Sequence, residues 1–173
     1  MSRGIIIFAQ NNEYINYAEQ ACACAGYARR SLSLFDEICL ITNTETLAPN
    51  ETLINEYFDR VIISDNFQPE NIRLFKDTTD KLEYAPFKNM SRSEVYKLSP
   101  YDETLVIDAD YFIMNDILDQ VWNSDNDVMI NSKYRDISGR HKENIEYIDN
   151  FSIPMYWATV FYFKKSDFAE NLF

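Results

Sequence analysis

The sequence has 173 residues, of which 46% are hydrophobic, so it is long enough for one compact domain with its own core. Its net charge of −12 argues against binding to nucleic acid or to an anionic membrane by bulk electrostatic attraction, because both partners are negatively charged. Only three glycines occur, which excludes both the GxGxxG dinucleotide-binding pattern and the glycine-rich phosphate loop. A phosphate ligand would therefore need a metal ion or cationic side chains.

The start of the chain and its cysteines are typical of a cytoplasmic protein. Residues 1–4 have no features of a signal peptide, and no apolar run approaches the roughly 20 residues of a transmembrane helix. Cys22, Cys24 and Cys39 are odd in number and show no CxxC spacing, so we interpret them as small buried apolar residues in a reducing compartment. We expect a single cytoplasmic domain over residues 1–173, without a membrane span.

The first thirty residues predict a strand, a polar turn and a helix. Residues 4–9 form an unbroken apolar run, which is typical of a strand covered on both faces. From Glu13 to Ala28 small and apolar residues recur at three- and four-residue spacing, which predicts a helix with Asn12 as its N-cap. Ligands of open α/β sheets bind beyond the carboxyl ends of strands, so the turn at 10–14 is a candidate binding place.

Two further strands are predicted in the next part of the chain. Residues 35–42 and 60–63 have apolar and β-branched centres. Residues 44–55 are polar and contain Pro49, so we expect a loop or a weak helix there. Residues 64–80 are polar and turn-rich and give no clear prediction.

A helix with a basic face is predicted over residues 85–98. Lys88 and Arg92 are i,i+4 neighbours on that face, and Pro100 breaks the helix before the next strand. The basic face would suit an anionic phosphate ligand. It would equally suit a solvated surface of an acidic protein, and the composition supports both interpretations.

The strand at 104–107 leads into two acids separated by one small residue, Asp108-Ala109-Asp110. Side chains alternate between the faces of a strand, so an acid-x-acid pair can direct both carboxylates the same way, ~6–7 Å apart. Two such carboxylates repel each other unless a cation lies beside them, and hard oxygen ligands suit Mg²⁺ or Mn²⁺. A pair of solvated turn acids is the alternative, and the residues alone support both equally.

The last third of the chain predicts further short elements. They are a short helix at 117–122, a strand at 127–131, a strand at 156–163 and the beginning of a helix after Ser166. Asn115 is the candidate cap of the first of these. Residues 133–150 are mostly polar and are expected to be exposed; they include the sole histidine, His141, for which we expect no metal-binding role.

With these elements placed, the chain resembles the nucleotide-sugar-binding half of a GT-A glycosyltransferase and is most similar to the family-8 galactosyltransferase and glycogenin-like enzymes. The first motif that carries the resemblance is residues 7–14, IFAQNNEY. The resemblance implies that this turn holds the nucleobase. Tyr14 would stack on the base and Asn11 would read its edge, with Ala9 and Gln10 in the same nucleotide-binding turn.

The second motif runs from Arg92 across the Pro100 break to Asp108 and Asp110. The resemblance implies that both acids meet a divalent metal ion, Mn²⁺ or Mg²⁺, and that Asp108 belongs to the nucleotide site as well. It also implies that Arg92, with Lys88 as the second candidate, supports the diphosphate. The implied fold is α/β, a Rossmann-like, open, mostly parallel sheet flanked by helices.

The implied function is a metal-dependent glycosyltransferase that moves a sugar from a nucleoside diphosphate sugar, with a UDP-sugar expected, to an unknown acceptor. Residues 157–159, Trp-Ala-Thr, replace the family's Asn-Ser-Gly-like turn, and the family's downstream histidine ligand is lacking, so we expect a minimal or C-terminally truncated member. No catalytic residue is assigned. Two alternatives remain: a GT-A domain that binds nucleotide or serves in assembly without turnover, and a nucleotidyltransferase.

Overall fold

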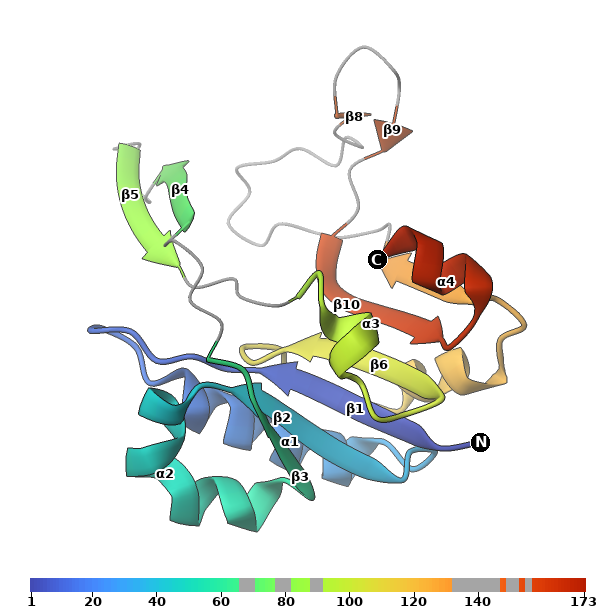
Figure 1. Ribbon diagram of the computed structural model, residues 1–173, viewed down its shortest axis with the longest axis horizontal. Coiled ribbons are helices and arrows are strands. Elements are labelled where there is room, and N and C mark those ends of the chain that lie inside the picture. Colours follow the sequence, from blue (N-terminus) through green and yellow to red (C-terminus); the bar gives the residue numbers. More distant parts are fainter. Residues whose placement is uncertain (66–70, 77–81, 88–91, 132–146, 149–152, 155–156) are drawn as a thin grey trace.

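The computed structural model describes residues 1–65, 71–76, 82–87, 92–131, 147–148, 153–154 and 157–173. Its centre is a six-stranded sheet in the order β3-β2-β1-β6-β10-β7 (Figure 1). The strands are β1 (Arg3–Phe8), β2 (Glu37–Thr42), β3 (Arg60–Ile63), β6 (Glu103–Asp108), β7 (Val128–Asn131) and β10 (Trp157–Lys164). β1, β2, β3 and β6 pair in parallel, whereas β10 runs antiparallel to both β6 and β7. The predicted open, mostly parallel α/β sheet is confirmed.

Helices cover both faces of this sheet (Figure 1). One face carries α1 (Tyr17–Ser31) and α2 (Thr44–Tyr57); the other carries α3 (Val95–Leu98) and α4 (Asp167–Leu172). A short 3₁₀ helix, η1 (Ile117–Asn123), packs into the α1 side through Trp122. Because both faces are covered, the middle of β1 is fully buried and apolar without alternation, as predicted.

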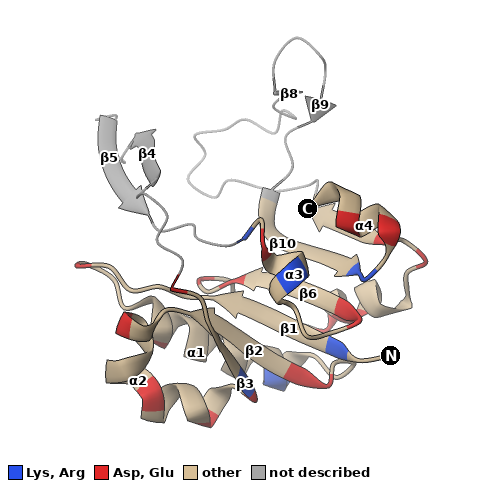
Figure 2. Ribbon diagram, in the orientation of Figure 1, with Lys and Arg blue, Asp and Glu red and all other residues tan. Residues whose placement is uncertain are grey.

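The two faces of β1 feed two separate cores. Ile5 and Ile7 pack with the helix α1, whereas Ile6 packs with Val95 of α3 and Phe163 of β10. Each fully buried aliphatic side chain of this kind stabilises the fold by roughly 1.5–3 kcal/mol. In the six-stranded sheet the charged residues lie at strand ends, so the middle of each of these strands is left for the core (Figure 2).

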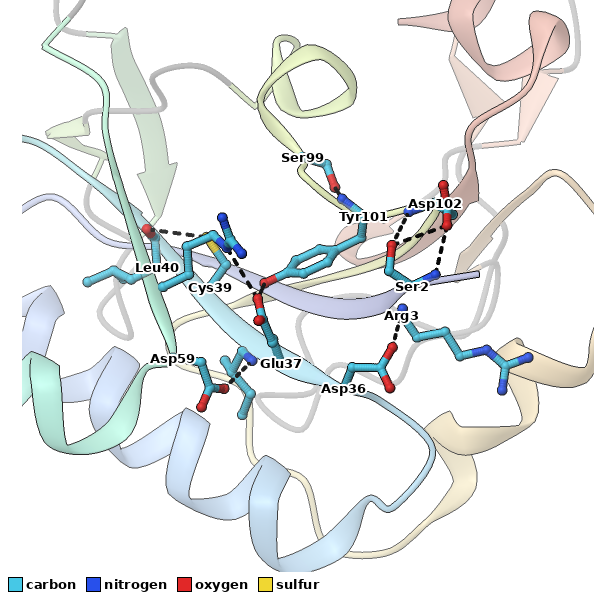
Figure 3. Close-up of polar contacts among 12 residues, drawn as sticks. Ser2, Arg3, Asp36, Glu37, Cys39, Leu40, Asp59, Ser99, Tyr101 and Asp102 are labelled. Atoms are coloured by element: carbon cyan, nitrogen blue, oxygen red, sulfur yellow. Dashed lines mark hydrogen bonds and ion pairs between the residues drawn. The ribbon is translucent and has the colours of Figure 1, made fainter.

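Carboxylates link the strands at the end of the sheet where the parallel strands begin, which we call the amino edge (Figure 3). Asp102 accepts hydrogen bonds from the backbone N–H of Ser2 at 2.7 Å and from its hydroxyl at 3.2 Å, which joins the starts of β1 and β6; these bonds lower the pKa of Asp102. Glu37 at the start of β2 accepts from the Tyr101 hydroxyl at 3.2 Å and pairs with Arg60 of β3 at 3.2 Å. The acids of this edge therefore connect neighbouring strands.

The predicted N-cap of the first helix was wrong. α1 begins at Tyr17, and its cap is Asn16, whose side chain accepts from the backbone N–H of Glu19. The Asn12 side chain instead accepts from the N–H groups of Tyr14 at 2.9 Å and Ile15 at 2.8 Å, which closes a turn before the helix starts. Asparagine suits both roles, so the sequence pattern alone did not separate them.

Residues 44–57 form a full helix, α2, rather than a loop or a weak helix. Pro49 lies inside it, but the Asn43 side chain caps its start by accepting from the N–H of Thr46 at 3.0 Å. The fully buried Ile54 fixes its later part against the core. Capping and packing together thus outweigh the cost of the proline.

The helix predicted over residues 85–98 was wrong at its beginning and confirmed at its end. Residues Leu82–Phe87 form strand β5, which pairs antiparallel with β4 (Asn71–Lys76), and among the described residues of the predicted range the helix is limited to Val95–Leu98. Pro86 lacks the N–H that a helix interior requires, which disfavours a helix through this position. Residues 88–91, and with them Lys88, lie outside the described residues.

Other expectations agree with the structure: β7 and β10 lie close to their predicted bounds, and the Ser166 hydroxyl caps α4 by accepting from the N–H of Ala169 at 3.2 Å. The predicted cap of η1 was wrong by one residue, because its N-cap is Asp116; the Asn115 side chain accepts from the N–H of Ile117 at 3.2 Å in the turn before it. The three cysteines are free and buried. His141 and almost all of residues 133–150 lie outside the described residues; within that range only Tyr147–Ile148 are described, as β8, which pairs with β9 (Ile153–Pro154). No helix of the described part is long and apolar enough to cross a membrane.

Gly4 gives a direct test of the packing at the amino edge. A Cβ atom at this position would overlap the buried ring of Tyr101, which the Glu37 carboxylate holds in place. We expect Gly4→Ala to lower the free energy of unfolding by about 1–3 kcal/mol, measured by urea denaturation.

Gly26→Ala is the matched control, because its Cβ would meet only the Tyr57 ring, at 3.3 Å, and because alanine favours the helix α1. Its effect should stay within about 1 kcal/mol of zero. Equal losses for the two variants would contradict the proposed close approach of Tyr101 to Gly4.

Candidate functional site

Three segments meet at the carboxyl-terminal edge of the parallel strands. Phe8, the last residue of β1, pairs with Asp108, the last residue of β6. Val160 of the antiparallel β10 pairs with Ile107, so the beginning of β10 reaches the same edge. The turn after β1, the two acids after β6 and the start of β10 are therefore neighbours.

The acid pair stands on a firmly held turn. The Asp108 carbonyl accepts from the N–H of Tyr111 at 3.1 Å and from the Cys24 thiol of α1 at 3.6 Å. Ala109 between the acids is buried, whereas Asp110 is exposed. Burial raises the pKa of Cys24 to about 12, and the charge of Asp110 adds to this effect, so the thiol keeps its proton and remains a donor.

Arg92 is the cation of this edge. Its guanidinium forms an ion pair with the Asp108 carboxylate and donates to the Ala158 carbonyl of β10 at 3.3 Å. Desolvation lowers the pKa of Arg92, while the charge of Asp110 raises it. The arginine thus connects the end of β6 to the start of β10 and lies within electrostatic range of both acids.

The turn after β1 is tied to both helices beneath it. The backbone N–H of Asn11 donates to the Thr46 hydroxyl at 2.8 Å, and its side-chain oxygen accepts from the N–H of Ala18 at 3.0 Å. The Asn11 amide nitrogen donates to the Asn16 side chain at 2.9 Å. The predicted edge reader Asn11 therefore already has structural partners, and its side chain has one amide hydrogen and one lone pair of its oxygen left for a ligand.

The other residues of this turn differ in what they offer to a ligand. Tyr14 is 83% exposed, so its ring can receive a stacking partner. Gln10 has a buried side-chain oxygen without a hydrogen-bond partner in the described part of the chain. Ala9 is buried and its N–H donates to the Ile41 carbonyl at 3.1 Å, so its side chain belongs to the core.

Sequence reasoning missed the amide network that supports this turn. The Asn16 side chain donates to Asn50 at 3.3 Å, and Asn50 donates to the Thr46 carbonyl at 2.8 Å. The Asn16 contribution could have been recognised from its place before Tyr17. Thr46 and Asn50 lie more than thirty residues away along the chain, and no local pattern marks them.

The described residues contain no group of three or more histidine, cysteine, aspartate or glutamate side chains that could hold a metal ion. Two carboxylates with further ligands from water and substrate phosphate are nevertheless a common arrangement for Mg²⁺. The Arg92 guanidinium already acts as a cation held by Asp108 and attracted by Asp110. Asp108 and Asp110 could therefore contribute two carboxylates to a cation site, whose other ligands would have to come from water or a bound phosphate.

Solved structures of three enzymes share the fold of this chain. The 4-diphosphocytidyl-2C-methyl-D-erythritol synthase of Anaerococcus prevotii is 14% identical, with a TM-score of 0.53 over 95% of this chain and 71% of its own. Mouse xyloside xylosyltransferase 1 is 10% identical, with a TM-score of 0.55 over 99% of this chain and 71% of its own. The bifunctional glycosyltransferase WbbM is 12% identical, with a TM-score of 0.56 over 99% of this chain.

The chain has a GT-A-like, Rossmann-like fold. At these identities the similarity concerns the fold and does not extend to the reaction. The chain spans only 33% of the length of WbbM. No protein-family model matches the sequence, and a search of curated proteins finds no match.

Thr46 offers a test of the support beneath the turn. It is almost fully buried, and Thr46→Val would leave the N–H of Asn11 without its acceptor at nearly constant volume. We expect a loss of about 1–3 kcal/mol in the free energy of unfolding, measured by urea denaturation.

Thr46→Ser is the control, because it keeps the hydroxyl and removes only a methyl group. It should be the more stable of the two variants. If Thr46→Val were as stable as the original protein, the hydrogen bond would not support the turn.

Proposed function

We propose that the chain binds a nucleoside diphosphate sugar at the carboxyl edge of its sheet and transfers the sugar as a metal-dependent glycosyltransferase. The observation that supports this most is the contact of Arg92 with Asp108 directly beside Asp110. It gathers two carboxylates and one guanidinium at the edge where α/β sheets bind their ligands. The fold, which solved glycosyltransferase structures share, is consistent with the proposal.

Each residue of the edge has a role in this proposal. Asp108 and Asp110 would hold Mn²⁺ or Mg²⁺. A cation bound there would neutralise the negative charge on the leaving nucleoside diphosphate. Arg92 would bind the diphosphate through its planar, two-pronged guanidinium. The partial burial of Arg92 would strengthen its contact with the diphosphate, because water screens partly buried charges less.

The turn after β1 would bind the nucleoside. Tyr14 would stack on the base, and the remaining hydrogen of the Asn11 amide would contact its polar atoms. The unpartnered oxygen of Gln10 is buried, so it would join them only after its side chain turns outward. Ala9 would contribute only through its backbone. UDP-sugars are the first donors to test, and the acceptor is left unassigned.

The decisive experiment measures binding and turnover separately. The protein is screened with nucleoside diphosphate sugars by thermal shift, with and without Mn²⁺, since a ligand that binds the folded state raises the melting temperature. Donors that bind are then incubated with Mn²⁺, and release of the free nucleoside diphosphate is followed. Slow release would support the transferase; binding without release would favour a nucleotide-binding module.

The second candidate is a nucleotidyltransferase. The fold shared with the diphosphocytidyl-methylerythritol synthase, itself a nucleotidyltransferase, supports it. The polar sequence Gln10-Asn11-Asn12-Glu13 after β1 argues against it, because such enzymes normally have a glycine-rich or basic phosphate loop there. Release of pyrophosphate from a nucleoside triphosphate would establish this alternative in the same assay.

Asp108→Asn should weaken Mn²⁺-dependent binding of UDP by at least about tenfold, measured by calorimetry. The substitution keeps the shape of the side chain but removes the charge that the cation needs, and even outer-shell partners of a metal contribute on the order of tenfold.

Asp116→Asn serves as the control, because Asp116 is an exposed acid a few residues further along the chain. It should bind like the original protein. Unchanged binding by Asp108→Asn, with its fold verified by circular dichroism, would remove the metal role from Asp108.

A further inference from the structure

Without a ligand, the Asp108 carboxylate already has a cationic partner. The Arg92 guanidinium pairs with it and is held on its other side by the Ala158 carbonyl of β10. Both side chains of the pair are only about a quarter exposed, at 25% and 23%, so water screens their interaction only partly. A divalent cation arriving at Asp108 would therefore meet an occupied carboxylate and a nearby positive charge.

We propose that Arg92 and a divalent cation compete for Asp108, and that a diphosphate ends this competition by taking Arg92 as its own partner. Cation and nucleotide would then bind cooperatively, and neither would bind tightly alone. The inference rests on the proposed function, and it adds an order of events at the site. It concerns what Arg92 does before the nucleotide arrives.

The local structure allows this exchange of partners without a change of fold. The backbone around Arg92 is fixed, since its carbonyl accepts from the N–H of Val95 at 3.2 Å and Val95 is fully buried under the sheet. The guanidinium stands at the end of a long flexible stem, so only side-chain rotation is needed to move it. A guanidinium fits a carboxylate and a phosphate with the same two-pronged geometry, so the two partners are interchangeable.

The charges at this edge favour the same exchange. Asp110 acts on Arg92 through space, so the guanidinium partly compensates both acids when no other cation is present. Once a divalent cation takes over that compensation, Arg92 is repelled by the cation and attracted by the new phosphate charges. By linkage, the factor by which nucleotide improves cation affinity equals the factor by which cation improves nucleotide affinity.

The test is the binding of Mn²⁺ alone to the protein and to Arg92→Gln, followed by electron paramagnetic resonance of free Mn²⁺. Competition predicts that Arg92→Gln binds Mn²⁺ more tightly, by roughly fivefold or more. If Arg92 instead served only the diphosphate, or only the fold, Mn²⁺ affinity would be unchanged or weaker, and either result would overturn the inference.

Arg30→Gln is the matched control, because Arg30 is an exposed arginine on α1 and its loss changes the net charge by the same amount. Its Mn²⁺ affinity should stay within about twofold of the original. If Arg92→Gln fails to fold by circular dichroism, Arg92→Lys replaces it. Lysine lacks the planar group that contacts the Asp108 carboxylate and the Ala158 carbonyl at the same time, so this variant should also bind Mn²⁺ more tightly than the original protein, though by a smaller factor.

A second titration repeats the Mn²⁺ measurement with saturating UDP. UDP should improve the Mn²⁺ affinity of the original protein by a larger factor than that of Arg92→Gln, and equal factors would overturn the cooperative part of the inference. If the original protein binds Mn²⁺ but not UDP, the proposed function fails for that nucleotide. The comparison of Mn²⁺ affinity between the original protein and Arg92→Gln still decides the competition.

Discussion

The parallel pairing of β1 with β6 is the constraint on which the rest of the molecule depends. Ile5, Ile6 and Ile7 lie beside Leu105, Val106 and Ile107 in register, and all six are fully buried. A slip of one residue would turn each side chain of a strand to the opposite face of the sheet, so that it would face the wrong one of the two cores. The same register sets Phe8 beside Asp108, so the stability of the core and the position of the acid pair have one origin.

The two edges of the sheet use acidic side chains in opposite ways. At the amino edge, Asp102 and Glu37 accept hydrogen bonds from neighbouring strands and hold the ends together. At the carboxyl edge, Asp110 is exposed and Asp108 pairs with the Arg92 guanidinium. Two carboxylates and one guanidinium leave this edge negative, so an anionic ligand would need the additional charge of a divalent cation there.

The sequence predicted those parts of the molecule that depend on local pattern. Unbroken apolar runs identified β1 and β6, and the acid pair was placed at a strand end, because burial on both faces leaves a clear signal. The helix predicted over 85–98 was wrong at its beginning, where β5 lies, because its apolar spacing was given more weight than Pro86. The contact of Arg92 with the Ala158 carbonyl joins residues 66 apart, and the contact of Thr46 with Asn11 joins residues 35 apart, so neither has a local signature.

The face of α1 that lies against the sheet consists of alanines and cysteines. Its buried residues are Ala18, Ala21, Cys22, Cys24, Ala25 and Ala28. Alanine has no side-chain rotamers to lose on folding, so this interface forms at almost no cost in side-chain entropy and has few alternative packings. The Cys24 thiol, which touches the Asp108 carbonyl, is part of that face. The acid pair therefore rests on a stiff support, and the exchange of partners that we propose would move the Arg92 side chain while this support stays in place.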